Sequence, residues 1–204
     1  MKNLKSSLFF IAIALVAASC SSDDNHTTAA VDTKTVSNLH APTTSNPGEP
    51  PAGDFVKFSF ATGEVVTSGD DWDIAFRATA ILVNGGTAAT GQPERTGLGA
   101  ASVVTGTFAE VATAPDDNLF AQDAATTAIP TGSGNGWYSY NAETHVISPI
   151  AGRVIVIKTH DGKYAKMEIL NYYQDAPAVP TGLEPSAYYK FNYSYQPSGT
   201  KSFE

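Results

Sequence analysis

The chain has 204 residues, a formal net charge of −8 and a single cysteine. This acidity argues against binding to nucleic acid and against electrostatic adhesion to anionic lipid, because both need an excess of positive charge. One cysteine cannot form a disulfide within the chain, so the stability of a folded domain must come from its core.

The N-terminus, residues 1–19, has the three parts of a secretory signal peptide. Lys2 and Lys5 are followed by an apolar run over 8–18 that is too short to span a bilayer, and small residues lead up to Cys20. Small residues directly before a cysteine resemble the lipobox of bacterial lipoproteins. The alternative is an ordinary signal peptide with an incidental cysteine. We expect cleavage before Cys20, a lipid on that residue and, because both lysines are lost, a mature charge of −10.

Residues 20–53 are expected to form the lipidated N-terminus and a flexible linker. The run 21–24, Ser-Ser-Asp-Asp, resembles the acidic tag that sends some Gram-negative lipoproteins to the outer face of the outer membrane. We therefore expect a lipid-anchored protein exposed on the cell surface. Residues 21–53 hold four prolines and no Phe, Trp or Tyr, so they offer too little apolar surface to offset the entropy of ordering.

Residues 54–204 are expected to form one all-β domain of antiparallel strands, with long loops and at most a short helix. Both tryptophans and all tyrosines lie here, in short runs separated by turn residues. The run 187–195 alternates so that Tyr189, Phe191 and Tyr193 share one face. The stretches 85–106 and 109–136 are poor in strand signals and are predicted to be long loops.

The segment 153–170 is predicted to be a β-hairpin. Asp161-Gly162 is a dipeptide typical of a two-residue type I′ turn. Such a turn would place Val156 opposite Met167. The face expected to lie on the core would then carry Val154, Val156, Met167 and Ile169.

Three carboxylates, Asp70, Asp71 and Asp73, surround Trp72. The cluster could suggest calcium, but no glycine follows at the spacing of a calcium loop, so we predict the start of a strand with Trp72 packed inward. The sequence contains no H-E-x-x-H, G-x-S-x-G or phosphate-binding motif, and its one cysteine is the expected lipid carrier. We therefore predict that the protein is not an enzyme.

Several short motifs resemble, in order and spacing, the HmuY family of haem-binding surface lipoproteins. They are Asp71-Trp72-Asp73-Ile74-Ala75-Phe76-Arg77, Asn84-Gly85-Gly86, Gly136-Trp137-Tyr138-Ser139-Tyr140, Gly152-Arg153-Val154, Asp161-Gly162-Lys163-Tyr164-Ala165-Lys166 and Tyr173-Gln174-Asp175-Ala176. The resemblance covers nearly all of residues 55–195. It implies an all-β domain that grips haem between loops through two axial His or Met side chains, and that delivers the haem to a TonB-dependent outer-membrane receptor.

The chain departs from this pattern at the expected ligands. Residues 41–144 contain no His and no Met, and Ala142 lies five residues after Trp137, where the resemblance places a ligand. His145 is the nearest substitute for binding the haem iron, and Tyr140 could ligate as a phenolate. The predicted haem-binding residues are His145, Tyr140, Tyr138 and Trp137, the last two as walls.

The other candidate ligands are expected to have ordinary roles. We predict that His160 is a solvated residue of the hairpin and that Met167 fills space in the core. His26 and His40 lie in the expected linker and could bind only loosely.

Two functions follow from the sequence. The first is a haem-binding lipoprotein for iron and haem acquisition. The alternative is a surface binding module on the same fold that binds another tetrapyrrole, a peptide or a partner lipoprotein. The absence of His and Met from 41–144 favours the alternative, and the family resemblance favours haem.

Overall fold

The computed structural model describes residues 31–46 and 48–204. The predictions for the signal peptide 1–19, for Cys20, for the acidic run 21–24 and for His26 lie outside the described residues. Within the described part, no helix is long and apolar enough to cross a membrane.

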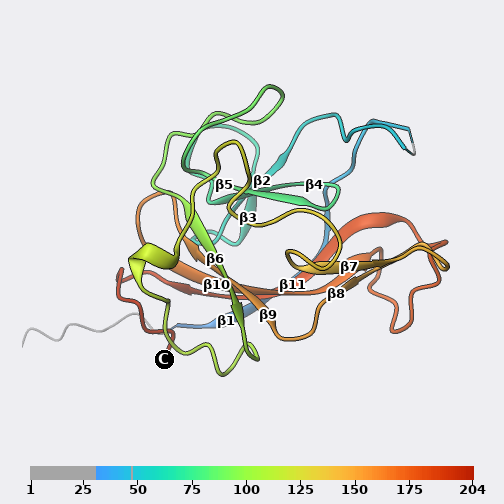
Figure 1. Cartoon of the computed structure of the whole chain (residues 1–204). Coiled ribbons are helices and arrows are strands. Elements are labelled where there is room, and N and C mark those ends of the chain that lie inside the picture. Colours follow the sequence, from blue (N-terminus) through green and yellow to red (C-terminus); the bar gives the residue numbers. More distant parts are fainter. Residues whose placement is uncertain (1–30, 47) are drawn as a thin grey trace, which may run out of the picture.

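The regular secondary structure of the described chain is almost entirely antiparallel β-strand, which confirms the predicted fold class (Figure 1). A five-stranded sheet has the order β1-β11-β10-β9-β6, a four-stranded sheet the order β3-β2-β4-β5, and β7 and β8 form a separate hairpin. The strands are β1 Thr33–His40, β2 Val56–Ser59, β3 Glu64–Val66, β4 Ile74–Arg77, β5 Ala80–Val83, β6 Ala100–Thr105, β7 Tyr138–Asn141, β8 Val146–Pro149, β9 Arg153–Lys158, β10 Tyr164–Tyr173 and β11 Ser186–Gln196. A short 3-10 helix, η1, spans Asp117–Leu119.

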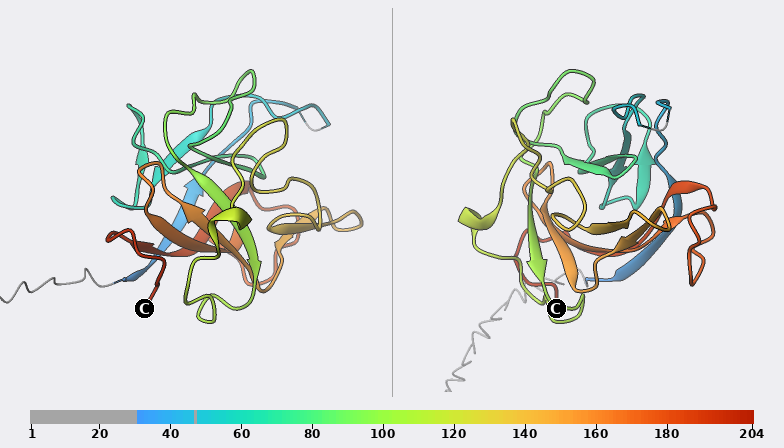
Figure 2. Two further views of the ribbon diagram at one scale, coloured as in Figure 1. Left: turned by 60° about the vertical axis from the view of Figure 1, so that its left-hand side comes forward. Right: turned by 45° about the vertical axis from the view of Figure 1, so that its right-hand side comes forward.

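The main core lies between the two sheets, which form separate layers in Figures 1 and 2. Tyr189, Phe191 and Tyr193 of β11 are fully buried, as their alternation predicts. Phe191 meets Phe58 of β2 edge to face at 5.5 Å, and Tyr189 lies 4.7 Å from Phe76 of β4. Burial of each such ring contributes about 1.5–3 kcal/mol, so this aromatic layer is a main source of stability without a disulfide.

Part of the segment 20–53, which was predicted to be a flexible linker, forms strand β1. Residues 33–40 pair with β11 along most of its length, and Leu39 is buried in the core. The pairing slips between Val36 and Leu39, where Asn38 takes a left-handed conformation with φ 56°. The linker prediction is therefore wrong for 33–40. Without β1, strand β11 would be an open sheet edge, and such edges are usually covered.

The β9–β10 hairpin forms, but with a register one residue away from the predicted one. Val156 faces Lys166, and Met167 faces Ile155. Thr159 N–H donates to the Lys163 carbonyl, which leaves a three-residue loop in which only Gly162 has positive φ. A type I′ turn needs two such residues, so the loop is the longer type that ends in a left-handed glycine.

Both faces of this hairpin are buried, which the prediction of a single core face missed. Ile155, Ile157 and Met167 lie in the main core, whereas Val154 and Val156 belong to a second cluster with Phe203.

Strand β6 was also missed, because 85–106 was predicted to be a loop. It pairs with β9 over its full length, and its second residue, Ala101, is buried in the main core.

Candidate functional site

The tip of the β7–β8 hairpin brings two predicted haem-binding residues together. The hydroxyl of Tyr140 and Nδ1 of His145 are hydrogen-bonded at 2.6 Å. Oδ1 of Asn141 accepts the backbone N–H groups of Glu143 and Thr144 and so fixes the turn between them. His145 has φ 56°, a left-handed conformation that costs a residue with a Cβ about 1–2 kcal/mol. Strain of this kind often marks functional positions.

This Tyr–His pair is open to solvent and lies beside an exposed apolar loop. Tyr140 is 43% exposed. The loop between β10 and β11 contacts the hairpin tip, because a Cβ on Gly182 would clash with the carbonyl oxygen of Thr144. In Figure 1 this orange-red loop lies next to β8. It carries Leu183 at 91% exposure and Val179 at 79%.

The exposed apolar loop has a defined shape. The carboxylate of Glu184 accepts hydrogen bonds from the backbone N–H groups of Thr181 and Gly182, at 3.0 and 3.1 Å, and from the Thr181 hydroxyl at 2.9 Å. Hydrogen bonds from the backbone N–H of Glu184 itself and from those of Thr181 and Gly182 hold the pKa of Glu184 below its usual value. Leu183 is thus presented to solvent by an ordered turn, and large apolar side chains held in this way are typical of binding surfaces.

Trp137 and Tyr138 lie in a different environment from Tyr140 and His145. Trp137 is only 2% exposed, and its indole N–H donates to the carbonyl of Thr79 at 3.0 Å. Its ring packs against Tyr189 and Tyr172 in the main core. Tyr138 is half-buried against Trp137. The structure therefore gives Trp137 a core position, with no ring face open to a ligand.

His160 is not the solvated residue that the sequence predicted. Its backbone N–H and its ring Nδ1 both bond Oδ1 of Asp73, at 3.1 and 2.7 Å, and the other carboxylate oxygen of Asp73 accepts the Phe60 N–H at 2.7 Å. Asp73 is buried, and burial raises its pKa although the His160 hydrogen bond opposes the shift. The pair joins the β9–β10 loop to the four-stranded sheet.

The acidic cluster around Trp72 is structural. Trp72 is fully buried, as predicted, whereas Asp71 is exposed and Asp73 is committed to His160. Among residues 31–46 and 48–204, no three His, Cys, Asp or Glu side chains are grouped to hold a metal ion.

Two buried polar groups that sequence reasoning missed shape the loop between β5 and β6. The Asn84 side chain donates to the carbonyls of Asp70 and Trp72 and accepts the N–H groups of Thr96 and Gly97. The Asn-Gly-Gly run at 84–86 is the sequence feature that could have indicated this tightly packed loop. Gly85 and Gly86 touch neighbouring backbone where no Cβ would fit.

The second buried polar group is an ion pair between Arg95 and Asp123, at 2.9 Å, with both side chains buried. Asp123 also accepts the backbone N–H groups of Val83 and Ala128. The pair ties the loop before β6 to the segment after η1. No local spacing could have revealed it, because the partners are far apart in the chain.

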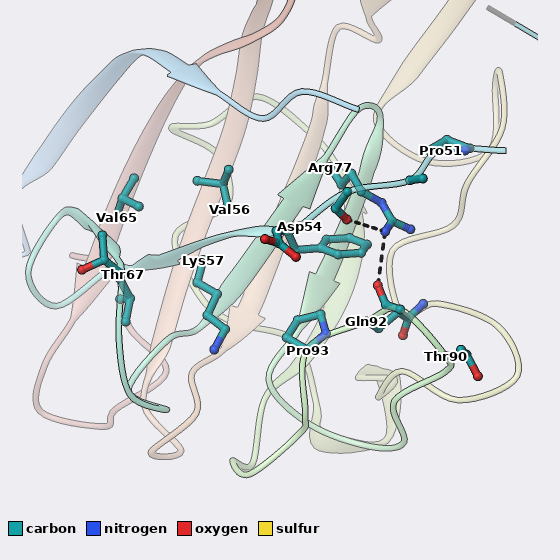
Figure 3. Close-up of a pocket in the computed structure, with 15 residues that line it drawn as sticks. Pro51, Asp54, Val56, Lys57, Val65, Thr67, Arg77, Thr90, Gln92 and Pro93 are labelled. Carbon is teal, nitrogen blue, oxygen red and sulfur yellow. Dashed lines mark hydrogen bonds between the residues drawn. The ribbon is translucent and has the colours of Figure 1, made fainter. Parts of the chain in front are cut away.

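A groove of about 980 Å³ lies along β2 of the four-stranded sheet (Figure 3). It is formed by residues 51–57, 65–67 and 90–93 together with Arg77. None of these residues is His, Met, Cys or Tyr, so the groove has no side chain of the kind that ligates haem iron. The groove and the Tyr–His pair are therefore separate candidate sites.

Comparison with known proteins agrees with the motifs. The model of the HmuY protein family matches residues 52–193. No curated protein matches the chain in sequence.

Three solved structures are similar in fold, each with a TM-score of 0.49. A HmuY-like heme binding protein from Bacteroides vulgatus is 15% identical, with 81% of this chain and 92% of that chain covered. A lipoprotein from Bacteroides fragilis is 13% identical, with coverage of 84% and 94%. The apo HmuY analog of Tannerella forsythia is 16% identical, with coverage of 82% and 96%. Because the family model spans most of the folded domain, this chain belongs to the HmuY family.

Proposed function

We propose that this protein is a haem-binding surface lipoprotein, and that it binds haem at the tip of the β7–β8 hairpin. Membership of the HmuY family supports haem as the ligand. The observation that carries the site is the hydrogen bond between Tyr140 and His145, which joins two potential iron ligands on an exposed surface. The protein acts by binding and transfer, not as an enzyme.

The pair would supply one ligand to the iron. Because Tyr140 and His145 are bonded directly to each other, they would act as one unit and not as two independent ligands. We assign iron binding to Tyr140, because a phenolate is an established haem ligand and Nδ1 of His145 is in place to accept its proton. His145 then orients and activates the ligand rather than replacing it.

The apolar loop supplies what the macrocycle needs. A porphyrin requires apolar surface as well as a ligand, and Leu183 and Val179 are exposed on the loop that contacts the hairpin tip. Because Glu184 holds this loop in shape, little ordering entropy would be lost on binding. The haem supplies the iron chemistry when bound, and the protein supplies the ligand and the apolar support.

The cellular setting is part of the same proposal. A lipid on Cys20 anchors the protein to the outer membrane, with the domain facing outward. The net charge of −8 is consistent with anchoring by acyl chains instead of by attraction to lipid headgroups. Haem that is held by one side chain on an open surface can be passed on readily. We propose a TonB-dependent outer-membrane receptor as the acceptor in haem acquisition.

The test is a titration of ferric haem into the intact chain, followed by absorbance. We expect saturable one-to-one binding and at least a tenfold loss of affinity, about 1.4 kcal/mol, in Tyr140→Phe. His145→Ala should weaken binding less and change the spectrum. The intact chain is required because truncation at residue 54 would remove β1 from the sheet.

A matched control exists on strands β1 and β11 of the five-stranded sheet. His40 and Tyr188 stack at 4.0 Å with nearly parallel rings, so they form a second accessible His–Tyr pair without a direct hydrogen bond. His40→Ala and Tyr188→Phe should leave haem binding unchanged. Equal loss from both pairs, or no saturable binding by the parent chain, would contradict the proposed site.

The alternative function is a non-haem binding module. The specific observation in its favour is that the described groove along β2 offers a cavity with no iron ligand, while residues 41–144 contain no His or Met. Unchanged free-haem absorbance in the titration would support this alternative.

A further inference from the structure

The groove along β2, lined by residues 51–57, 65–67, 77 and 90–93, has features of a ligand site that the proposed haem function does not use. It opens between strand β2 and the loop 90–93, and Figure 3 shows Lys57, Arg77 and Pro93 around it. A volume of about 980 Å³ lies at the upper end of the range for small-molecule sites.

The groove is locally positive in an acidic protein. Lys57 and Arg77 line it together with one carboxylate, Asp54, whereas the whole chain carries a net charge of −8. An anion would therefore be attracted to this place and repelled elsewhere on the surface. Charge complementarity favours a ligand that carries carboxylate groups.

Arg77 holds the groove in a fixed form. One of its terminal nitrogens donates to the carbonyls of Gly53 at 2.9 Å and Gly91 at 3.2 Å, which lie on the two sides of the groove. The guanidinium also stacks over the ring of Phe55 at 4.1 Å. A site that is already braced loses little entropy when a ligand enters.

Part of the remaining lining is apolar. Phe55, Val66 and Pro93 are half-buried and line the groove beside the two cations. Flat rings pack well against phenyl and pyrrolidine rings. The chemistry of the lining thus combines a surface for a flat apolar body with positive charge for its acidic groups.

We propose that this groove binds a flat aromatic carboxylate, up to the size of a porphyrin, without metal coordination. Lys57 pairs with a carboxylate, Arg77 braces the groove and adds to its positive charge, and Phe55 and Pro93 pack against the flat body. The site is independent of Tyr140 and His145, and it does not require that haem binds at the hairpin tip.

The experiment titrates iron-free protoporphyrin IX into the intact chain and follows porphyrin fluorescence. Lys57→Glu should weaken binding at least tenfold, because it reverses a charge that faces the groove, and Lys57→Arg should retain binding. Lys34→Glu makes the same charge change on the exposed face of β1 and serves as the control. Far-ultraviolet circular dichroism checks that each variant folds.

The outcomes separate this site from the haem site. Loss of porphyrin binding in Lys57→Glu, with Tyr140→Phe and Lys34→Glu unchanged, supports the proposal. Loss in Tyr140→Phe would overturn it, because the ligand would then lie at the hairpin tip. Absence of saturable porphyrin binding, or an equal effect of both Lys→Glu changes, would also overturn it. Saturable binding of an acidic peptide in place of the porphyrin would assign the groove to a peptide.

Discussion

Two hairpin tips of this protein each carry a histidine, and their surroundings differ. His160, on the β9–β10 loop, is bonded through its backbone and its ring to the buried carboxylate of Asp73. His145, on the β7–β8 loop, is exposed and bonded to Tyr140 of the same hairpin. Both residues flank a turn in the sequence, and the sequence offered little to separate them.

The difference teaches that the role of a histidine depends on which element packs against its turn. The β9–β10 tip meets the four-stranded sheet, so His160 satisfies a buried acceptor and its ring is committed to structure. The β7–β8 tip contacts a surface loop and leaves His145 and Tyr140 exposed, so that a ligand can reach them. We therefore expect changes at the first tip to affect stability and changes at the second to affect binding.

The largest expected effect comes from Asp73→Ala. The backbone N–H of Phe60 and two donors of His160 would lose their acceptor inside the protein. We expect the free energy of unfolding to fall by about 3 kcal/mol, measured by urea denaturation with tryptophan fluorescence. Asp71→Ala is the matched control, since that carboxylate is exposed and 3.9 Å from the His160 ring. Equal losses in the two variants would mean that the hydrogen bonds of Asp73 to Phe60 and His160 add nothing specific to the stability of the protein.

A smaller loss is expected from His160→Ala. This change removes the ring donor and leaves Asp73 with its two backbone partners, so we expect a loss of about 1–2 kcal/mol. His145→Ala in the same denaturation assay should change stability by less than about 0.5 kcal/mol, because the residue is exposed. A reversed order of the two variants would break the distinction between the tips.

An effect smaller than that of His160→Ala, and of opposite sign, is expected from His145→Gly. Glycine adopts φ 56° without the strain of a Cβ, although it also makes the unfolded chain more flexible. We expect a net gain of about 0.5 kcal/mol in the free energy of unfolding, measured by urea denaturation, together with weaker haem binding. Thr144→Gly, at a neighbouring position without positive φ, should not stabilise the protein. A stabilised variant that still binds haem fully would argue against a role for His145.

Local sequence patterns determined much of this protein. Alternation over 187–195 placed Tyr189, Phe191 and Tyr193 in the core, and the Trp72 motif predicted a buried indole. The all-β class followed from short apolar runs between turn residues. These features could be predicted because the two-residue period of a strand is written in neighbouring positions. The ordered motifs also gave the family, although the structure shows that several of their residues, such as Trp137 and Asn84, serve the fold.

Only the tertiary structure decided the rest. Residues 33–40 have a linker-like composition, yet they pair with β11, where Thr33 and Ser194 are 161 residues apart in sequence. The register of the β9–β10 hairpin depends on a three-residue loop whose His160 is held by Asp73, 87 residues distant in sequence. The accessible pair of Tyr140 and His145 likewise depends on the turn that brings both rings to one side. The sequence by itself specified which strand faces could be buried. Long-range packing decided the partners of the buried polar groups, because a buried donor or acceptor must bond to a group that the fold places beside it.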